Sequence, residues 1–401
     1  MTSAPAPAVT SAKPGAGLTA VLALSCGLTV ANLYYAQPLL DAIARRFDVA
    51  EGTAAFVVTA TQVGYVLGLL FVLPLGDLVE TRRLVSRTLV LTALSAAVCA
   101  AAPSYGVFLI GSLILGITSV VAQVLIPYAA HLADDASRGR MIGMVMTGLL
   151  TGILLARSFS SVVAGAFGWR SIFAVSAVLM LGLAVALPRI LVPREPEHRM
   201  SYARLLGSVV ALVPELPALR RRALSQALMF GAFSAFWSAV AFELINDHGL
   251  DQFQIGLFAL AGAGGAVAAP VAGRLGDRGH STIGGGLLIL LGIAAMAAAG
   301  LGRDRLWVLV LAGFAVDFAV QGHQVLSQRE IYGLRADARS RINTVFMSSV
   351  FTGGAIASAG TGLLHDSGGW TAATWLGGGF AAAAFVIWGL AALRARSREV
   401  R

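Results

Sequence analysis

The sequence predicts an all-α membrane protein with twelve transmembrane helices, arranged as two similar six-helix halves. Three observations predict this fold class. Of the 401 residues, 57% are hydrophobic and only 12% are charged, which is about half of the charged share of soluble domains. Apolar runs of about 20 residues recur along the chain, and each is long enough to cross a bilayer as a helix. Features of the first half also return in the second half.

The apolar runs give the positions of the predicted spans. We expect them at 18–40, 53–74, 85–103, 105–131, 141–166, 171–190, 223–246, 253–273, 282–302, 306–330, 342–364 and 371–393. Cytoplasmic loops carry an excess of Arg and Lys. With the N-terminus in the cytoplasm, five of the 29 basic residues fall outside and Arg157 falls within a span, which leaves 23 on the cytoplasmic side. We therefore expect both termini in the cytoplasm, and the net charge of +9 implies no nucleic-acid partner.

The two tails and the segment that joins the halves are expected in the cytoplasm. Residues 1–17 are rich in Pro and Ala, and we expect a disordered cytoplasmic tail. They lack the charged segment leading into a short apolar stretch that marks a cleavable signal peptide. Residues 18–190 form the first half, the polar segment 191–222 a cytoplasmic linker, 223–393 the second half, and 394–401 a basic cytoplasmic tail. Neither cysteine, Cys26 or Cys99, indicates a disulfide or a metal site.

The internal repeat is an ordered series of matches at nearly constant offset. Gly76-Asp77 matches Gly276-Asp277 at an offset of 200 residues. Further matches follow at an offset of 201: Gln123-Val124-Leu125 with Gln324-Val325-Leu326, Arg138 and Arg140 with Arg339 and Arg341, Thr151-Gly152 with Thr352-Gly353, and Gly168-Trp169 with Gly369-Trp370. Two parallel halves around a central site are a known transporter architecture.

These residues resemble the major facilitator superfamily over nearly the whole chain. GRLGDRG, with Asp277 and Arg278, is similar to the family's loop signature between the second and third helices, and PLGDLVETRR, with Asp77, Arg82 and Arg83, is a weaker copy. GWRSIF at 168–173 is another habitual feature. NLYYAQPLL and RSRINTVFMSSVFTGG resemble the branch of bacterial efflux permeases that includes sugar- and drug-efflux proteins. The resemblance implies alternating access around a cavity lined by helices 1, 4, 7 and 10.

The two charged corners are candidates for a cytoplasmic gate. Asp77 can meet the positive N-terminus of helix 11 and nearby arginines of the other half, here Arg339 and Arg341. Asp277 can do the same toward helix 5, near Arg138 and Arg140. The alternative is that these charges only stabilise the helix ends.

Polar groups inside a span are costly and therefore mark candidate sites. Asp317 lies about eleven residues into its span, roughly 16 Å at the helical rise and so near the midplane. Gln321 and Gln324 share its face, and His323 lies on an adjacent face. A carboxyl in this position can load and unload a proton, so Asp317 and His323 are the proton-coupling candidates. A permanently paired structural Asp317 is the alternative.

Arg157 is the sole basic residue deep in a span. Three roles are open to it: pairing with Asp317 across the halves, attracting an anionic group of a substrate, or extending along lipid toward the surface.

Other polar and aromatic residues of the spans are candidates for the substrate cavity. Of Tyr34 and Tyr35, at most one faces the cavity squarely, because neighbouring helical residues differ by 100° in direction. The selected candidates are Asn32, Tyr35 and Gln37 of helix 1, Gln123 of helix 4, Phe236 and Trp237 of helix 7, and Gln321 and Gln324 of helix 10. Helix 1 is expected to end or kink at Pro38.

The sequence departs from drug:proton antiporters at two points. The Arg that many of them carry in helix 4 is replaced by Ser112, and the stretch GLLTGILLARS of helix 5 lacks their Gly-Pro pair. Coupling by protons would therefore run through Asp317 or His323.

The chain is predicted to be a secondary transporter of a bacterial inner membrane and no enzyme. No phosphate-binding loop, metal-ligand spacing or catalytic dyad is present in the sequence, so we expect no cofactor and no metal. The expected partners are a small organic substrate, protons and membrane lipid, with the chain as a monomer. Proton-coupled export is the favoured mode. Proton symport or facilitated uptake is the alternative, and a transport-dead sensor is disfavoured because no segment is long enough for an output module.

Overall fold

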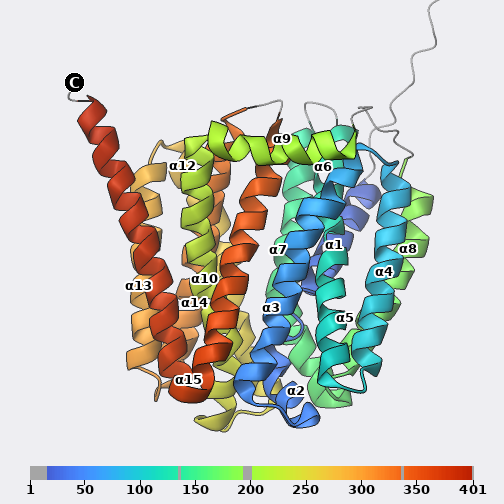
Figure 1. Ribbon diagram of the computed structural model, residues 1–401, viewed down its shortest axis with the longest axis vertical. Helices are drawn as coiled ribbons and strands as arrows, with labels where there is room; N and C mark the ends of the chain where they lie inside the picture. The colour runs from blue at the N-terminus through green and yellow to red at the C-terminus, as the bar shows by residue number, and fades with distance from the viewer. Residues whose placement is uncertain (1–15, 134–136, 193–200, 336–337, 400–401) are drawn as a thin grey trace, which may run out of the picture.

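The computed structural model describes residues 16–133, 137–192, 201–335 and 338–399, and these residues form helices joined by turns. The predicted tail 1–17 lies outside the described residues except for its last two positions. The backbone of the predicted basic tail continues the last helix as far as Glu399. The helices run roughly parallel to one another across the molecule (Figure 1).

The first half is built from eight α-helices and three shorter helical turns. They are α1 (Ala16–Ala31), η1 (Gln37–Leu39), α2 (Leu40–Phe47), α3 (Glu51–Leu67), η2 (Gly68–Val72), η3 (Leu73–Asp77), α4 (Thr81–Ala101), α5 (Tyr105–Thr118), α6 (Val121–Leu132), α7 (Arg138–Phe167) and α8 (Ser171–Ile190). The segment η2 is a π-helix, so that α3, η2 and η3 form one continuous span with a local change of pitch.

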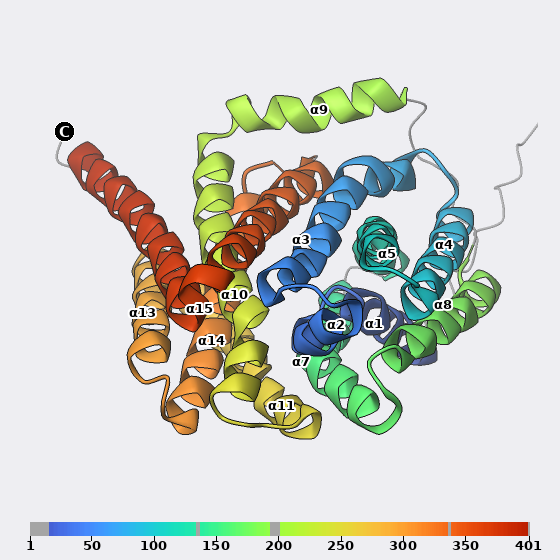
Figure 2. The same cartoon turned by 60° about the horizontal axis from the view of Figure 1, so that its bottom comes forward.

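The second half follows the connecting helix α9 (Tyr202–Glu215). It contains α10 (Pro217–Asn246), α11 (Gln252–Phe258), η4 (Ala259–Gly262), α12 (Ala263–Asp277), α13 (Ser281–Leu301), α14 (Leu306–Tyr332) and α15 (Arg339–Glu399). Figure 2 shows the two groups of helices beside each other, with α3 and α7 of the first half next to the second half.

The predicted spans are present as apolar helices. Ten helical segments of the described chain are long and apolar enough to cross a membrane, and α1 is a shorter apolar helix. One of the ten, Arg339–Leu393, contains two predicted spans, because the chain turns back at Gly369. Gly369 has a φ of +51°, which is a conformation that favours glycine. The fold class is therefore the predicted one.

Close helix contacts repeat at the same offsets as the sequence. In the first half Gly152 of α7 lies against the backbone of Gly27 in α1, and in the second half Gly353 of α15 lies against the backbone of Ala227 in α10. A side chain at either glycine would overlap the facing helix, as is typical of small residues in membrane helix packing. A second pair follows the same pattern: Gly64 against Leu113, and Gly264 against Phe314. The halves are thus related in packing as well as in sequence.

The prediction for helix 1 was wrong at its outer end. The helix α1 ends at Ala31, well before Pro38, and the chain continues through turns into η1 and the short helix α2. The Asn32 side chain explains the early end, because its amide donates to the backbone carbonyl of Thr29 at 3.1 Å and so competes with regular helix bonding. Pro38 lies inside η1.

The linker between the halves contains the amphipathic helix α9. Its residues Leu205, Val209 and Leu212 are buried, while the helix lies across the ends of the other helices (Figure 1). The Tyr202 hydroxyl donates to the backbone carbonyl of Phe71 at 2.7 Å, which ties the linker to the first half.

Candidate functional site

A buried ion pair joins the two halves in the interior of the molecule. Arg157 comes from α7 of the first half and Asp317 from α14 of the second half. The Nη2 atom of Arg157 lies 3.4 Å from Oδ1 of Asp317, and the two side chains are only 1% and 4% exposed. Of the three roles open to Arg157, the structure has the pairing across the halves, and burial excludes a side chain that reaches toward the surface.

Trp237 of α10 is the second partner of both charged groups. Its indole N–H donates to Oδ2 of Asp317 at 2.7 Å. The same indole ring lies under the guanidinium of Arg157, whose central carbon is 3.7 Å from the ring centroid. A cation over an aromatic face is stabilised by the ring quadrupole, and more strongly when both groups are desolvated. Trp237 therefore fixes the orientation of the pair from a third helix.

Two more rings complete an aromatic wall around the guanidinium. The central carbon of Arg157 lies 5.3 Å from the ring centroid of Phe233 and 5.7 Å from that of Tyr34. Tyr35 and Phe236 are the neighbouring residues that were predicted from the sequence to line the cavity. Both are buried, but the Phe236 ring packs against Trp237 and Trp370, and the contact of Tyr35 with α7 is through its backbone carbonyl, which accepts from the Ser160 hydroxyl. The rotation of each helix decides between neighbouring aromatic residues, and the apolar pattern of these spans leaves that rotation undefined.

The guanidinium of Arg157 is only partly satisfied. Within the described part of the chain, its Nε and Nη1 atoms have no hydrogen-bond partner, although both are buried. The side-chain oxygen and nitrogen of Gln37 are also buried and unpartnered there. A buried donor without a partner costs about 1–3 kcal/mol, and more when it is charged. The arrangement is therefore one that a bound group could improve.

The backbone of η4 closes over the pair at Gly262. A Cβ atom at this position would lie 3.2 Å from Oδ1 of Asp317 and 3.3 Å from Nη2 of Arg157. These distances are shorter than ordinary van der Waals contact, so a side chain at this position would press on both charged groups.

The repeat shows that the fold itself does not require these charges. At the offset of 201 residues, the counterpart of Arg157 is Ser358 and the counterpart of Asp317 is Gly116. Each of the two positions therefore carries a charged residue in one half and an uncharged residue in the other half. A costly feature that only one of two similar halves carries is a functional candidate.

His323 is separated from this cluster by its hydrogen bonds. It is buried on α14, where its ring nitrogens lie 2.5 Å from Oε1 of Gln226 and 3.2 Å from Oγ of Ser225, both on α10. These hydrogen-bond partners of His323 belong to its own half, whereas Asp317 pairs with Arg157 of the other half.

The polar residues predicted to lie around Asp317 do not form its hydrogen bonds. Gln321 packs against Gly265 of α12, and Gln324 lies 3.5 Å from Gln226. The partners of Asp317 are instead Arg157 and Trp237, because α14 turns its carboxylate toward α7 and α10.

Two further cavity candidates lie elsewhere. Asn32 accepts a hydrogen bond from Ser176 of α8 and so faces the interior of the first half. Gln123 accepts from Asn343 of α15 at 3.2 Å, which is a contact between the halves away from the charged cluster.

The charged corners differ from the expected pattern in one respect. Asp277 forms an ion pair with Arg329 of its own half, a partner that the sequence did not predict. The reason is the packing of α12 on α14: a Cβ at Gly276 would lie only 2.9 Å from Cδ of Arg329, so that this arginine reaches the end of α12. Arg83 pairs with Glu80 at 3.0 Å, and Arg339 donates to the Tyr332 carbonyl at 3.2 Å. Arg82, Arg140 and Arg278 lie at the surface or half-buried, and the side chain of Arg138 lies outside the described part.

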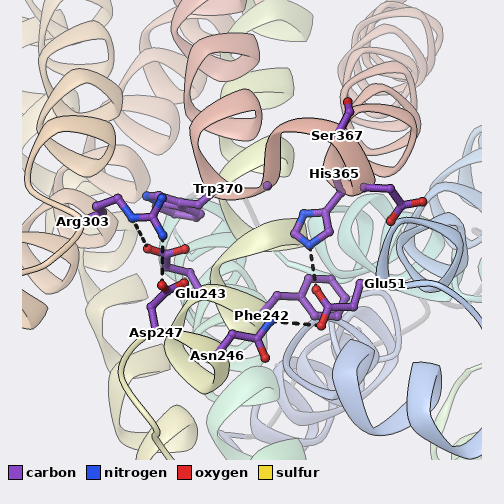
Figure 3. Close-up of a pocket in the computed structure, with 11 residues that line it drawn as sticks. Glu51, Phe242, Glu243, Asn246, Asp247, Arg303, His365, Ser367 and Trp370 are labelled. Carbon is purple, nitrogen blue, oxygen red and sulfur yellow. Dashed lines mark hydrogen bonds and ion pairs between the residues drawn. The ribbon is translucent and has the colours of Figure 1, made fainter.

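At the opposite end of the molecule from α9, hydrogen bonds and an ion pair join the two halves. Glu51 at the start of α3 accepts from Asn246 at 3.0 Å and lies 2.8 Å from Nε2 of His365 (Figure 3). The Gly52 amide donates to Asp366 at 3.2 Å. Deeper in the interface, the hydroxyls of Thr59 and Ser358 are 2.8 Å apart.

A pocket of about 420 Å³ lies at this closed end. Glu243 and Asp247 both face Arg303, each with an oxygen 3.1 Å from a guanidinium nitrogen (Figure 3). This pocket could not be predicted from the sequence, because its residues come from four segments that are far apart in the chain. The charges of the pocket are largely paired with one another.

Two six-helix halves that are closed at one end and share a buried charge pair define a secondary transporter of the alternating-access class. Comparison with known proteins gives the family. The model of the Major Facilitator Superfamily matches residues 22–223 and again residues 222–401. The chain belongs to this superfamily, and as such it is a multi-pass membrane transporter and no enzyme.

Relatives and solved structures agree with this assignment. The protein named "Uncharacterized transporter YgaY" from Escherichia coli O157:H7 is 40% identical over 374 residues, covering 92% of this chain and 94% of its own. "Probable transporter SCO4007" from Streptomyces coelicolor is 34% identical over 376 residues, with 91% and 86% covered. The inward-facing, unoccupied structure of a bacterial homologue of the human lysosomal transporter Spinster is similar, with a TM-score of 0.66, 16% identity, and 94% and 95% of the chains covered. These relatives support the superfamily, and they do not define an efflux branch.

Proposed function

We propose that this transporter exports a small organic molecule across the bacterial inner membrane, with proton coupling at Asp317. The observation that carries the proposal is the buried ion pair between the halves. A carboxylate and a guanidinium inside the membrane are costly, and such residues commonly mark proton relays and substrate pathways. Asp317 is paired with the opposite half, so a proton on this carboxyl would change the interaction between the two bodies that must move.

The coupling follows from the two bonds of Asp317. While the carboxylate is charged, it holds Arg157 of α7 and accepts from Trp237 of α10. A proton on Asp317 removes its charge and weakens the 3.4 Å contact with Arg157. The halves are then free to rearrange around the centre, and deprotonation restores the pair. In this scheme the protonation state of Asp317 sets the strength of the contact between the two halves.

The export direction rests on the resemblance of NLYYAQPLL and RSRINTVFMSSVFTGG to efflux permeases. In a bacterium the proton gradient points inward, so exchange of an incoming proton for an outgoing substrate would drive export. The membrane is proposed from relatives such as the "Inner membrane transport protein YnfM" of Escherichia coli K12, which is 25% identical over 262 residues. The excess of basic residues supports cytoplasmic termini, on the side of α9 and the end of α15 (Figure 1).

We further propose that residues 18–190 and 223–393 act as the two moving bodies and that 191–222 connects them. Asp77, with Arg339 and Arg341, would close the cytoplasmic side. Asp277 with Arg329 would stabilise the corresponding end of the second half. The contacts of Glu51 and Gly52 would form the outer gate, which is closed in this structure.

A second candidate function is symport, in which substrate and proton move in the same direction. The two unpartnered donors of Arg157 favour it. An acidic group of a substrate would find these donors available, and a proton on Asp317 would leave the guanidinium charge for that group.

Proteoliposomes with a pH-sensitive dye in the lumen test the proposal, using a substrate found by a thermal-shift screen. Substrate added outside enters down its gradient. Antiport moves protons out and makes the lumen more alkaline, whereas symport makes it more acidic. Substrate uptake with no change in luminal pH would show that transport is independent of protons and would overturn the proposal.

A further inference from the structure

We infer that the substrate is a small organic anion with a flat apolar body, whose acidic group binds the guanidinium of Arg157. The inference deepens the proton coupling proposed at Asp317 and rests on its symport form, because it assigns a substrate that binds the same central cluster together with a proton. It is carried by what Arg157 lacks: a complete set of hydrogen-bond partners in a fully buried position.

The contact with Asp317 leaves most of the guanidinium unused. Strong pairs between arginine and a carboxylate are commonly bidentate, with N–O distances of about 2.7–2.9 Å. Here a single nitrogen reaches one oxygen of Asp317 at 3.4 Å, and the other oxygen accepts from Trp237. The Nε and Nη1 atoms face no acceptor within the described residues. Nε and Nη1 lie on different edges of the guanidinium, and an oxygen of a carboxylate or sulfonate could accept from either of them.

Charge selects an anion over a cation at these donors. A guanidinium has donors only and no acceptor, so a cationic ligand gains no hydrogen bond from it. A neutral amide can offer one carbonyl oxygen but carries no opposite charge. An anion satisfies the donors and also attracts the guanidinium, and hydrogen bonds between charged groups are roughly twice as strong as neutral ones.

The rings around Arg157 define the rest of the ligand. Tyr34 and Phe233 lie edge to face, with centroids 6.5 Å apart, on the same side of the cluster as the guanidinium. Phe233 also stacks on Phe230 at 5.1 Å. Aromatic walls of this kind pack well against a flat ring and poorly against a strongly hydrated body. The acidic group therefore comes attached to a flat apolar group.

The anion and a proton belong in the site together. The titratable and charged groups that contact the guanidinium are Asp317 of α14 and Tyr34, which follows α1; Trp237 and Phe233 of α10 carry no charge. The pair of Arg157 and Asp317 has no net charge, and an added anion would leave one uncompensated negative charge in a buried place. A proton on Asp317 removes that excess. Binding of the anion is therefore predicted to tighten as pH falls. Symport, the second candidate function, requires this pH dependence.

Binding to purified protein in detergent tests this inference without any gradient. The probe is benzenesulfonate, whose charge does not change with pH, compared with neutral benzenesulfonamide and cationic phenyltrimethylammonium. Quenching of Trp fluorescence and the shift of the thermal midpoint report binding. We expect wild type to prefer the anion by about tenfold or more, and to bind it more tightly at acidic than at alkaline pH.

Three variants complete the test. Asp317→Asn should bind benzenesulfonate equally well at both pH values, because its side chain is permanently neutral. The double variant Arg157→Gln/Asp317→Asn strands no charge and should fold, yet lose the preference for the anion. Arg170→Gln is the matched control, since that guanidinium also lies over a tryptophan, Trp169, at 4.6 Å, but lies away from the pair.

Two results would overturn the anion assignment: equal binding of all three probes, or anion binding that survives in the double variant. Either result would leave proton coupling at Asp317 standing, since that is tested by flux in vesicles. Conversely, anion preference in detergent without proton-dependent flux would retain the substrate class and reject the coupling.

Discussion

The energetic weight of the buried pair can be measured by replacing Arg157 and Asp317 alone and together. Arg157→Met keeps an unbranched side chain without the charge, and Asp317→Asn keeps the shape of the carboxylate. At 3.4 Å, two unit charges attract by about 5 kcal/mol when the effective dielectric constant is 20. Removing one partner of a buried pair costs about 3–5 kcal/mol, largely because the other charge is stranded.

The two single variants should differ in their response to pH. In Arg157→Met the stranded group is Asp317, which a proton can neutralise, so the loss of stability should shrink as pH falls. In Asp317→Asn the stranded group is Arg157, which stays charged throughout the accessible range. The free energy of unfolding of this variant should therefore show no pH dependence from the site, whereas that of wild type falls once acid protonates Asp317.

Reversible unfolding in mixed micelles, followed by Trp fluorescence, gives the free energies for a double-mutant cycle. We expect the double variant to be more stable than the sum of the single effects allows, with a coupling of about 2 kcal/mol or more at alkaline pH. Arg170→Met, paired with Asp317→Asn, serves as the uncoupled control. Additivity within about 0.5 kcal/mol for Arg157 and Asp317 would refute the reasoning.

Three further predictions address the parts around the pair. Gly262→Ala would place a Cβ 3.2 Å from the carboxylate and 3.3 Å from the guanidinium of the pair, so transport should slow several-fold at normal expression. The control Gly143→Ala has open space around it and should transport like wild type. Equal rates in the two variants would show that the close approach is unimportant. The hydroxyls of Thr59 and Ser358 are 2.8 Å apart across the halves. In a background without Cys26 and Cys99, cysteines at these two positions should form a disulfide that blocks transport until a reductant is added. Undiminished transport by the cross-linked protein would contradict opening at this side. Asp77→Asn should slow transport strongly with little change in substrate affinity, and a wild-type rate in vesicles would remove Asp77 from the gate.

The sequence was sufficient to predict the pairing of Arg157 with Asp317 as one alternative. The reason is that few charges lie deep in the spans, and a buried charge needs a partner. The offsets of the repeat likewise predicted two similar halves, and the matched contacts of Gly152 and Gly353 follow those offsets.

Side-chain directions could not be predicted in the same way. Spans that are apolar on every side have no polar face to define their rotation, so Tyr35 and Phe236 were selected where Tyr34 and Phe233 surround the guanidinium. A signal for Gly262 existed only in three dimensions, because its role depends on the approach of η4 to two other helices.

Local hydrogen bonding also changed two expectations. Asn32 bonds to the backbone of its own turn and ends α1 early, and Asp277 pairs with Arg329 of its own half. Both outcomes depend on short-range geometry that residue type and spacing do not determine.

The central claim is that Asp317 carries the coupled proton, and vesicle transport by Asp317→Asn tests it most directly. The asparagine mimics the protonated carboxyl permanently, so the loaded carrier can still change its conformation, whereas net proton-coupled flux needs deprotonation. We predict that this variant loses accumulation driven by a pH gradient but still exchanges internal for external substrate, while Asp48→Asn at the exposed C-cap of α2 keeps both activities. Accumulation driven by a pH gradient that persists in Asp317→Asn would contradict the account and direct attention to His323.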